Sequence, residues 1–128
     1  MGFSIGFASK PYQQQKQALV KQRYNDIYAH ELAHKNAAGS LGGSIVIEKD
    51  GKGIPIGGHV NIKMPSLNPQ NPDATIKHAD TVIKAAMAPG DPSGQDYKVA
   101  AEAQSIKAQA QKCKSENKTV GQRLNIIA

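Results

Sequence analysis

Residues 24–39 read Tyr-Asn-Asp-Ile-Tyr-Ala-His-Glu-Leu-Ala-His-Lys-Asn-Ala-Ala-Gly, and the architecture of the chain follows from them. They belong to a longer pattern, over residues 12–38, in which apolar side chains recur three and four residues apart. The members of that stripe are Val20, Tyr24, Ile27 and Tyr28. Gly39 is typical of a helix end, because glycine readily adopts the left-handed conformation found there. The pattern therefore predicts one long helix.

An HExxH motif, His30-Glu31-Leu32-Ala33-His34, lies inside this predicted helix. Residues four apart on a helix project from the same face, so His30 and His34 could chelate one metal ion. Glu31 is rotated about 100° from His30 around the helix, where it could reach a metal-activated water without being a ligand. This arrangement predicts a zinc hydrolase in which Glu31 is the general base.

A β-hairpin is expected after the helix. Residues 44–48 are short and β-branched, and Asp50-Gly51 is a strong signal for a two-residue turn. The second strand continues to Ile62 and is interrupted by Gly57 and Gly58. Paired glycines inside a strand predict a bulge or a place where another group approaches the backbone closely.

Two further helices complete the expected fold. The first covers residues 73–88, with an apolar face formed by Ile76, Ala79, Ile83 and Met87. The second begins after Ser93 and Asp96, which resemble a capping box, and extends to about residue 114. We therefore predict an α+β fold, minimal and zincin-like, with a long HExxH-bearing helix, a short antiparallel β-hairpin and two further helices.

The length of 128 residues allows one modest core, so we expect a single domain over residues 12–114. Residues 1–11 are interpreted as a flexible N-terminal arm, or as a strand that docks elsewhere, and residues 115–128 as a flexible C-terminal tail. No apolar run approaches the length of a membrane span, and no secretory signal is visible. A single cysteine, Cys113, fits a reducing compartment. These features predict a cytoplasmic protein without a membrane span.

The net charge of +6 would attract acidic partners weakly. The positive excess is spread along the chain, and no aromatic side chains are interleaved with the lysines near the C-terminus to stack on bases. Nucleic acid is therefore not the expected partner. A basic module that binds nucleic acid or an acidic protein is kept as a third hypothesis, and it predicts binding that weakens steeply with salt.

A catalytic zinc usually has three protein ligands, so the two motif histidines need a third partner. His59, directly after the glycine pair, is the predicted third ligand. Strand alternation alone leaves its direction open, since a bulge at the glycines would re-aim the side chain. The alternative interpretation is a surface histidine, or one hydrogen-bonded within the hairpin.

Three other side chains could take part in the site. Asp96 either caps its helix or holds a metal-bound imidazole in one tautomer. If His59 is not the third ligand, Asp96 and His78 are the next candidates. Tyr97 either packs or donates a hydrogen bond to an oxyanion. His78 is interpreted as a solvated helical histidine, with a role as ligand or oxyanion stabiliser as the alternative.

Five short motifs occur in a fixed order over roughly residues 20–103. They are Ala29–His34 followed by Ala37–Gly39, Gly57–Val60, Pro72–Thr75, Ala85–Pro89 and Pro92–Asp96. Together they resemble the bacterial SprA-related family of zinc metalloproteases. The family has glutamate at the position of His59, and both residue types ligate zinc. The resemblance implies a metal-dependent peptidase without implying a substrate.

The first functional hypothesis is therefore a zinc-dependent metallopeptidase that takes a peptide or protein substrate. The substrate would lie extended along the hairpin edge and pair with backbone groups near Gly57 and Gly58. The alternative is a non-catalytic metal-binding or protein-interaction domain on the same scaffold, since so small a chain offers a shallow cleft. The sequence leaves the oligomeric state open.

Overall fold

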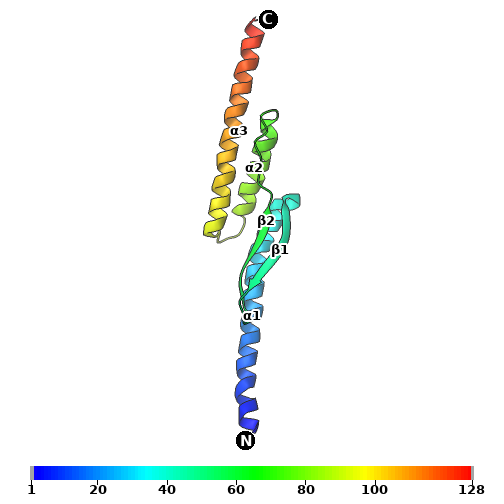
Figure 1. Cartoon of the computed structure of the whole chain (residues 1–128), viewed down its shortest axis with the longest axis vertical. Coiled ribbons are helices and arrows are strands. Elements are labelled where there is room, and N and C mark those ends of the chain that lie inside the picture. Colours follow the sequence, from blue (N-terminus) through cyan, green and yellow to red (C-terminus); the bar gives the residue numbers. More distant parts are fainter. Residues whose placement is uncertain (1, 128) are drawn as a thin grey trace.

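A computed structural model describes the backbone of residues 2–127 and the side chains of residues 10–118. It contains a long helix, an antiparallel hairpin and two further helices, so the predicted α+β arrangement is confirmed (Figure 1). The elements are α1 (Gly2–Ala38), a short 3-10 helix η1 (Gly39–Leu41), β1 (Gly42–Lys49), β2 (Pro55–Ile62), α2 (Pro72–Ala86) and α3 (Gly94–Ile127). The hairpin lies along the second half of α1, and α2 and α3 lie side by side near the end of α1 (Figure 1).

Helices α1 and α3 are longer than the sequence pattern predicts. Helix α1 begins at Gly2 and carries Pro11 inside it, so the alternative of a docking strand before Pro11 is wrong for residues 2–10. Proline costs a helix one hydrogen bond, but its φ angle is already helical, and here the helix continues through it. Because a helix can extend past the packed part of a domain, the predicted boundaries at residues 11 and 114 stay predictions.

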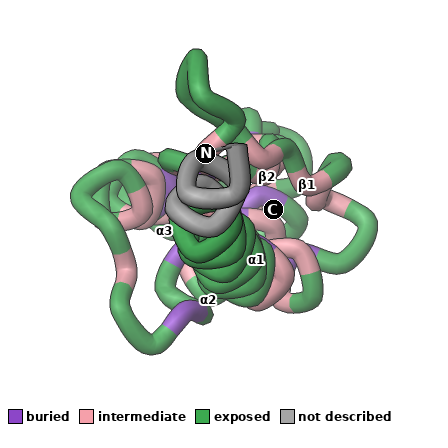
Figure 2. The backbone as a smooth tube through the Cα atoms, turned by 90° about the horizontal axis from the view of Figure 1, so that it is seen from below, coloured by how far each residue is buried: buried purple, intermediate pink, exposed green. Residues whose placement is uncertain are grey.

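Among residues 10–38 of α1, the buried positions lie in the last third of the helix. Residues 10–26 are almost all exposed, as the green turns of α1 in Figure 2 show. Tyr24 and Tyr28, which the periodicity assigns to a core stripe, are each 40% exposed and stack on each other with ring centroids 6.0 Å apart. The buried positions are Glu31, His34 and Ala38, which recur at helical spacing. The face of α1 that packs against the rest of the protein is therefore the face that carries the HExxH motif.

The hairpin turn at Asp50 is held by that residue's own side chain. The Asp50 carboxylate accepts hydrogen bonds from the backbone N–H groups of Lys52 at 2.8 Å and Ile54 at 3.0 Å. The Ile54 bond, followed by the Lys52 bond, lowers the pKa of Asp50 below its ordinary value. The connection spans more than two residues, with Gly53 at a positive φ of 80°.

The glycine pair in β2 has the close backbone approach that its sequence predicts. A Cβ atom on Gly58 would lie 2.7 Å from Ile27 Cγ2 and 3.1 Å from Glu31 Cγ, both on α1. The strand register is also irregular beside Gly57, because Glu48 pairs with Gly57 while Lys49 pairs with Pro55. The absence of a side chain at Gly58 thus lets the hairpin lie directly against the HExxH helix.

Helices α2 and α3 run antiparallel and pack through small side chains. The fully or nearly buried apolar residues of the pair are Ala79, Val82, Ala85, Ala86, Ala103 and Ala110. Lys107 and Lys114 on α3 make 2.7 Å ion pairs with Asp80 and Asp73 on α2, which places the two helices in register. Alanine allows close helix contact, and this contact brings the start of α3 next to the end of α2.

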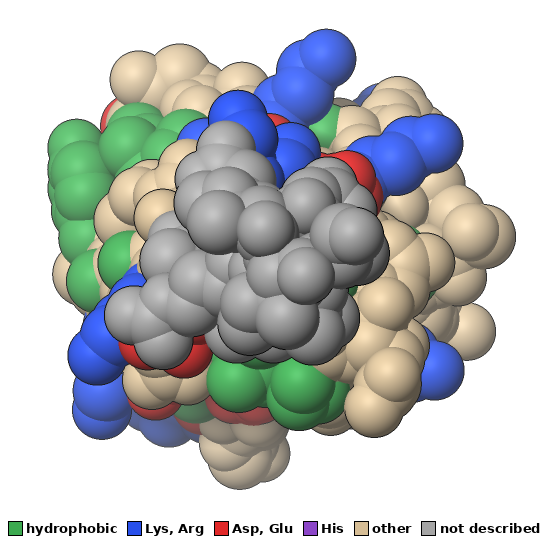
Figure 3. Space-filling view, turned by 90° about the horizontal axis from the view of Figure 1, so that it is seen from above, with side chains coloured by type: hydrophobic (Ala, Val, Ile, Leu, Met, Phe, Trp, Pro, Cys, Tyr) green, Lys and Arg blue, Asp and Glu red, His purple; other side chains and the backbone are tan. Residues whose placement is uncertain are grey.

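The apolar face predicted for α2 is displaced around the helix. Val82 is fully buried, whereas Met87 lies past the helix end and is 37% exposed. Within the described residues, no helix is both long and apolar enough to cross a membrane. Lysine and arginine side chains stand around the rim of the face drawn in Figure 3, so on this face the positive charge is not gathered into one block.

Candidate metal centre

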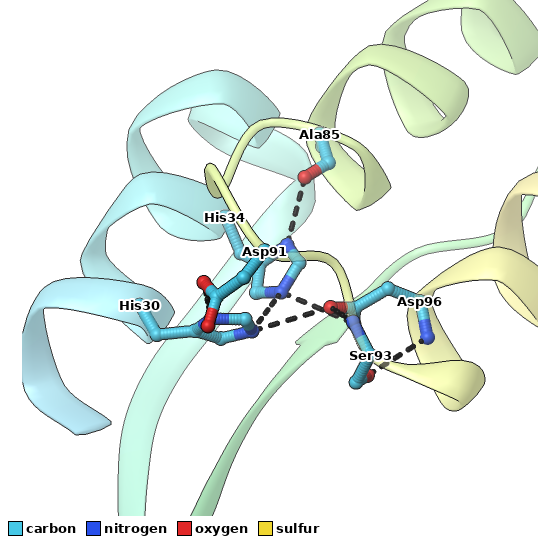
Figure 4. Close-up of polar contacts among 6 residues, drawn as sticks. All are labelled: His30, His34, Ala85, Asp91, Ser93 and Asp96. Carbon is cyan, nitrogen blue, oxygen red and sulfur yellow. Dashed lines mark hydrogen bonds and ion pairs between the residues drawn. The ribbon is translucent and has the colours of Figure 1, made fainter. Parts of the chain in front are cut away.

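Three side chains from two distant parts of the chain converge beside the end of α2 (Figure 4). His30 Nε2 lies 3.3 Å from His34 Nε2, as expected for imidazoles four residues apart on one helix. Asp96, in the first turn of α3, places Oδ2 3.2 Å from His30 Nε2 and Oδ1 3.1 Å from His34 Nε2. The two Nε2 atoms and the Asp96 carboxylate therefore form a cluster of three groups, called the triangle below, in which each imidazole faces a different carboxylate oxygen.

The other nitrogen of each imidazole faces an acceptor outside this triangle. His34 Nδ1 lies 2.8 Å from the backbone oxygen of Ala85, and because a carbonyl only accepts, Nδ1 carries the proton. His30 Nδ1 lies 3.5 Å from Asp91 Oδ1, on a side chain that is almost fully exposed. An imidazole that donates through Nδ1 presents the lone pair of Nε2, which is the arrangement found in metal-binding histidines.

The donor atoms of the triangle fit a zinc ion. Zinc bonds of about 2.0–2.1 Å at tetrahedral angles separate neighbouring ligand atoms by about 3.3–3.4 Å. The two Nε2 atoms are 3.3 Å apart, and each has a different oxygen of Asp96 at 3.1–3.2 Å. With neutral imidazoles, the lone pair of His34 Nε2 points at an oxygen of Asp96 that is also an acceptor. A cation between them would relieve that repulsion. The chemistry of these three groups therefore suits a divalent metal.

Asp96 also begins helix α3. The backbone N–H of Ser93 donates to Asp96 Oδ2 at 2.8 Å, and the backbone N–H of Asp96 donates to Ser93 Oγ at 3.1 Å, which confirms the predicted capping box. Burial raises the pKa of Asp96, but the Ser93 N–H bond and nearby His34 outweigh burial and leave that pKa below its ordinary value. Asp96 is therefore a carboxylate at neutral pH.

Glu31 lies beside the triangle without being part of its direct contacts. It is 6% exposed, and one of its carboxylate oxygens lies within 4.8 Å of a ligand atom of His30 and of His34. Within the described side chains it makes no hydrogen bond or ion pair. A buried carboxylate that no protein group engages is available to accept a proton from a water molecule in the site.

These groups line one cavity of about 380 Å³ between α1, β2 and the start of α3. His59 also lines it, but its Nδ1 lies 3.1 Å from Glu48 Oε1 across the hairpin, and the side chain is 45% exposed. That cross-strand contact matches the alternative interpretation of His59. As the third metal ligand, His59 stays a prediction that no contact in the structure tests.

The remaining predicted site residues lie apart from the triangle. His78 Nε2 lies 2.8 Å from the carbonyl oxygen of Lys63 and so joins α2 to the end of the hairpin. Tyr97 is 56% exposed and does not line the cavity. Gly58 lines the cavity, whereas Gly57 borders a neighbouring depression that also includes His30 and Glu31.

Sequence reasoning missed two groups of the site. The Ala85 carbonyl carries no side-chain signal, and only the packing of α2 on α1 brings it to His34. Glu102 lines the cavity from α3. It follows Asp96 by six residues, which is about 120° around the helix, so helical spacing from Asp96 does not indicate it. The sequence predicts Asp96 as a cap or as a partner of a bound imidazole, and as a ligand only if His59 is not one.

Comparison with known proteins gives one match. The model of the SprA-related family matches residues 7–123. No curated protein and no solved structure matches the chain. The family match covers the HExxH motif, the hairpin, Asp96 and most of α3.

Proposed function

The chain belongs to the SprA-related family, and from the convergence of His30, His34 and Asp96 we propose that it is a zinc-dependent peptidase. The observation that carries the proposal is this cluster: the two Nε2 atoms are 3.3 Å apart, Asp96 Oδ2 lies 3.2 Å from that of His30, and Asp96 Oδ1 lies 3.1 Å from that of His34. The proposed ligands are these three residues. Asp96 replaces His59 in the set because it contacts both imidazoles, whereas His59 pairs with Glu48.

When bound, zinc polarises the scissile carbonyl and lowers the pKa of a water molecule. Glu31 takes the proton from the attacking water and passes it to the leaving amine. The Ala85 carbonyl fixes the tautomer of His34, and the Asp91 carboxylate lies 3.5 Å from His30 Nδ1. The burial of Glu31 and its lack of a protein partner among the described residues support this assignment.

The substrate lies extended beside β2. The described sheet has only two strands, β1 and β2, so β2 keeps one edge without a strand partner there. Backbone groups on such an edge can pair with an extended peptide, and Gly58 and the residues after it line the cavity. This placement brings a peptide bond next to the three proposed ligands and Glu31.

The second candidate function is a metal-binding domain without catalysis. The proposed ligands join α1 to α3, and the apolar core consists mostly of alanine, so a metal could serve to stabilise the fold. Both functions predict the same metal site. They differ in the role of Glu31, because only the peptidase needs a base.

Two measurements test the proposal. Inductively coupled plasma mass spectrometry on the untagged protein should find about one zinc per chain, as the single ligand triangle predicts. His30→Ala and Asp96→Ala should lose the zinc, and His59→Ala should keep it. Glu31→Gln should keep the zinc and lose cleavage of a peptide library.

The outcomes of these measurements distinguish the two ligand sets and the two functions. Loss of zinc in His59→Ala with retention in Asp96→Ala would restore the ligand set predicted from the sequence. Equal cleavage by the parent and Glu31→Gln would refute the peptidase mechanism. Zinc binding with no cleavage by the parent would favour the non-catalytic function.

A further inference from the structure

The proposed metal ligands line only part of the cavity. Helix α3 lines another part through Val99 and Glu102, which follow Asp96 at intervals of three residues. Successive positions spaced in this way are neighbours on the helix surface, so Val99 adjoins both Asp96 and Glu102. At 1.5 Å per residue, Glu102 lies about 9 Å along the helix axis from Asp96. The cavity therefore continues from the proposed metal ligands toward Glu102.

The charge of this cavity is opposite to that of the whole chain. The chain has 16 Lys and Arg against 10 Asp and Glu. The cavity is lined by the carboxylates of Glu31, Asp96 and Glu102 and by no lysine or arginine. If a divalent metal is bound, it balances the charges of Glu31 and Asp96, and Glu102 is left as an uncompensated negative charge.

Glu102 is not engaged by the lysines of its own helix. Lys98 precedes it by four residues, but no ion pair joins the two side chains, and Lys107 is held by Asp80 at 2.7 Å. Within the described side chains, Glu102 has no hydrogen bond or ion pair. Its carboxylate is therefore free to receive a cation from a ligand.

Apolar side chains line the same cavity as the ligands and Glu102. Ile62 contributes from the end of β2, Met64 from the loop after it and Val99 from α3. An apolar wall together with one unpaired carboxylate matches the two parts of a lysine or arginine side chain, an aliphatic stem and a cationic head.

We propose that Glu102 selects peptides that carry lysine or arginine next to the scissile bond. This inference deepens the proposed peptidase function and rests on it, because a peptide has a scissile bond only if the protein cleaves it. The preference for a cationic side chain is a binding property of the cavity and can be measured without hydrolysis. Glu102 acts on specificity and takes no part in the chemical step.

The test compares two peptides that differ by one charge. One is acetyl-Gly-Leu-Lys-Leu-Gly-amide, and the other has norleucine in place of lysine, which keeps a straight apolar chain without the ammonium. Their dissociation constants are measured by isothermal titration calorimetry on the full-length Glu31→Gln protein, with zinc and with EDTA. Glu31→Gln/Glu102→Gln removes the charge, and Glu31→Gln/Glu116→Gln changes a glutamate of α3 outside the cavity as a control.

The lysine peptide should bind Glu31→Gln about fivefold more tightly than the norleucine peptide, since an exposed ion pair contributes up to about 1 kcal/mol. Glu102→Gln should reduce the ratio to near one, and Glu116→Gln should leave it unchanged. The ratio should persist in EDTA and fall as salt rises. Equal binding of the two peptides, or a ratio that survives Glu102→Gln, overturns the inference. A ratio that depends on Glu102, together with a parent protein that cleaves neither peptide, supports the cavity preference and refutes the peptidase proposal.

Discussion

Replacing Gly58 by alanine should loosen the contact between the hairpin and α1. The added Cβ would lie 2.7 Å from Ile27 Cγ2, 3.0 Å from the Val46 carbonyl oxygen and 3.1 Å from Glu31 Cγ. The 2.7 Å separation is shorter than any stable carbon contact, and a β-branched side chain and a backbone oxygen have little freedom to withdraw. The strand must therefore shift away from the helix.

Overpacking of this kind costs about 1–3 kcal/mol of unfolding free energy. For a chain of this size, that corresponds to a fall in melting temperature of about 3–12 °C. Gly57 provides the matched control, because nothing lies within 4 Å of a Cβ built there and its φ is not positive. Gly57→Ala should be neutral or stabilising by up to about 1 kcal/mol, since it reduces the entropy of the unfolded chain.

Both variants can be compared with the parent by thermal unfolding followed by circular dichroism, and by urea titration for the free energy. The reasoning predicts that Gly58→Ala is the less stable of the two. Equal melting temperatures for Gly58→Ala and Gly57→Ala would refute it, because the hairpin would then have room for a methyl group against α1.

Three other predictions concern the proposed metal ligands, the Ser93 cap of α3 and the Asp50 turn of the hairpin. Asp96→Ala should weaken zinc binding by at least about 100-fold in competition with a chelating dye, whereas His59→Ala should change it less than about threefold. Similar losses in both variants would contradict the assigned ligand set. Ser93→Ala should lower the unfolding free energy by about 1 kcal/mol in urea, because it removes the oxygen that accepts from the first turn of α3. No change would mean that this cap is not formed in solution. The lowered pKa of Asp50 means that its charged form stabilises the turn above its ordinary pKa, and that this contribution is lost as pH falls through the folded value. The melting temperature of Asp50→Asn should therefore fall less than that of the parent between pH 5 and pH 2. Parallel curves of melting temperature against pH would contradict this.

Local patterns in the sequence are sufficient to predict the HExxH helix, the hairpin and the two later helices. Each is encoded by periodicity, turn residues or a cap within a few neighbours, as Asp50 and Ser93 illustrate. Local patterns predict the start of the first helix and its buried face less well. The predicted N-terminal arm ends at Pro11, but the helix contains this residue, and Tyr24 and Tyr28 of the predicted stripe are partly exposed.

The site could be predicted only in part for the same reason. His30, Glu31 and His34 are neighbours on one helix, so their geometry follows from the motif. Asp96 is 66 residues away from His30, and the packing of α2 on α3 decides whether it reaches the histidines. His59 lies in a regularly paired stretch of the hairpin, opposite Val46, but the sequence does not say which face of that stretch packs on α1.

The carboxylate of Asp96 has two partners at once, the start of α3 and the pair of histidines. One of its oxygens already accepts a hydrogen bond from the Ser93 backbone N–H. A ligand that binds the carboxylate therefore also changes the hydrogen bonds at the start of the helix. Amide hydrogen exchange in the first turn of α3 would therefore slow when the site is filled. Occupancy of the proposed metal site could then be followed by mass spectrometry of amide hydrogen exchange at Asp96 and its neighbours, without a substrate.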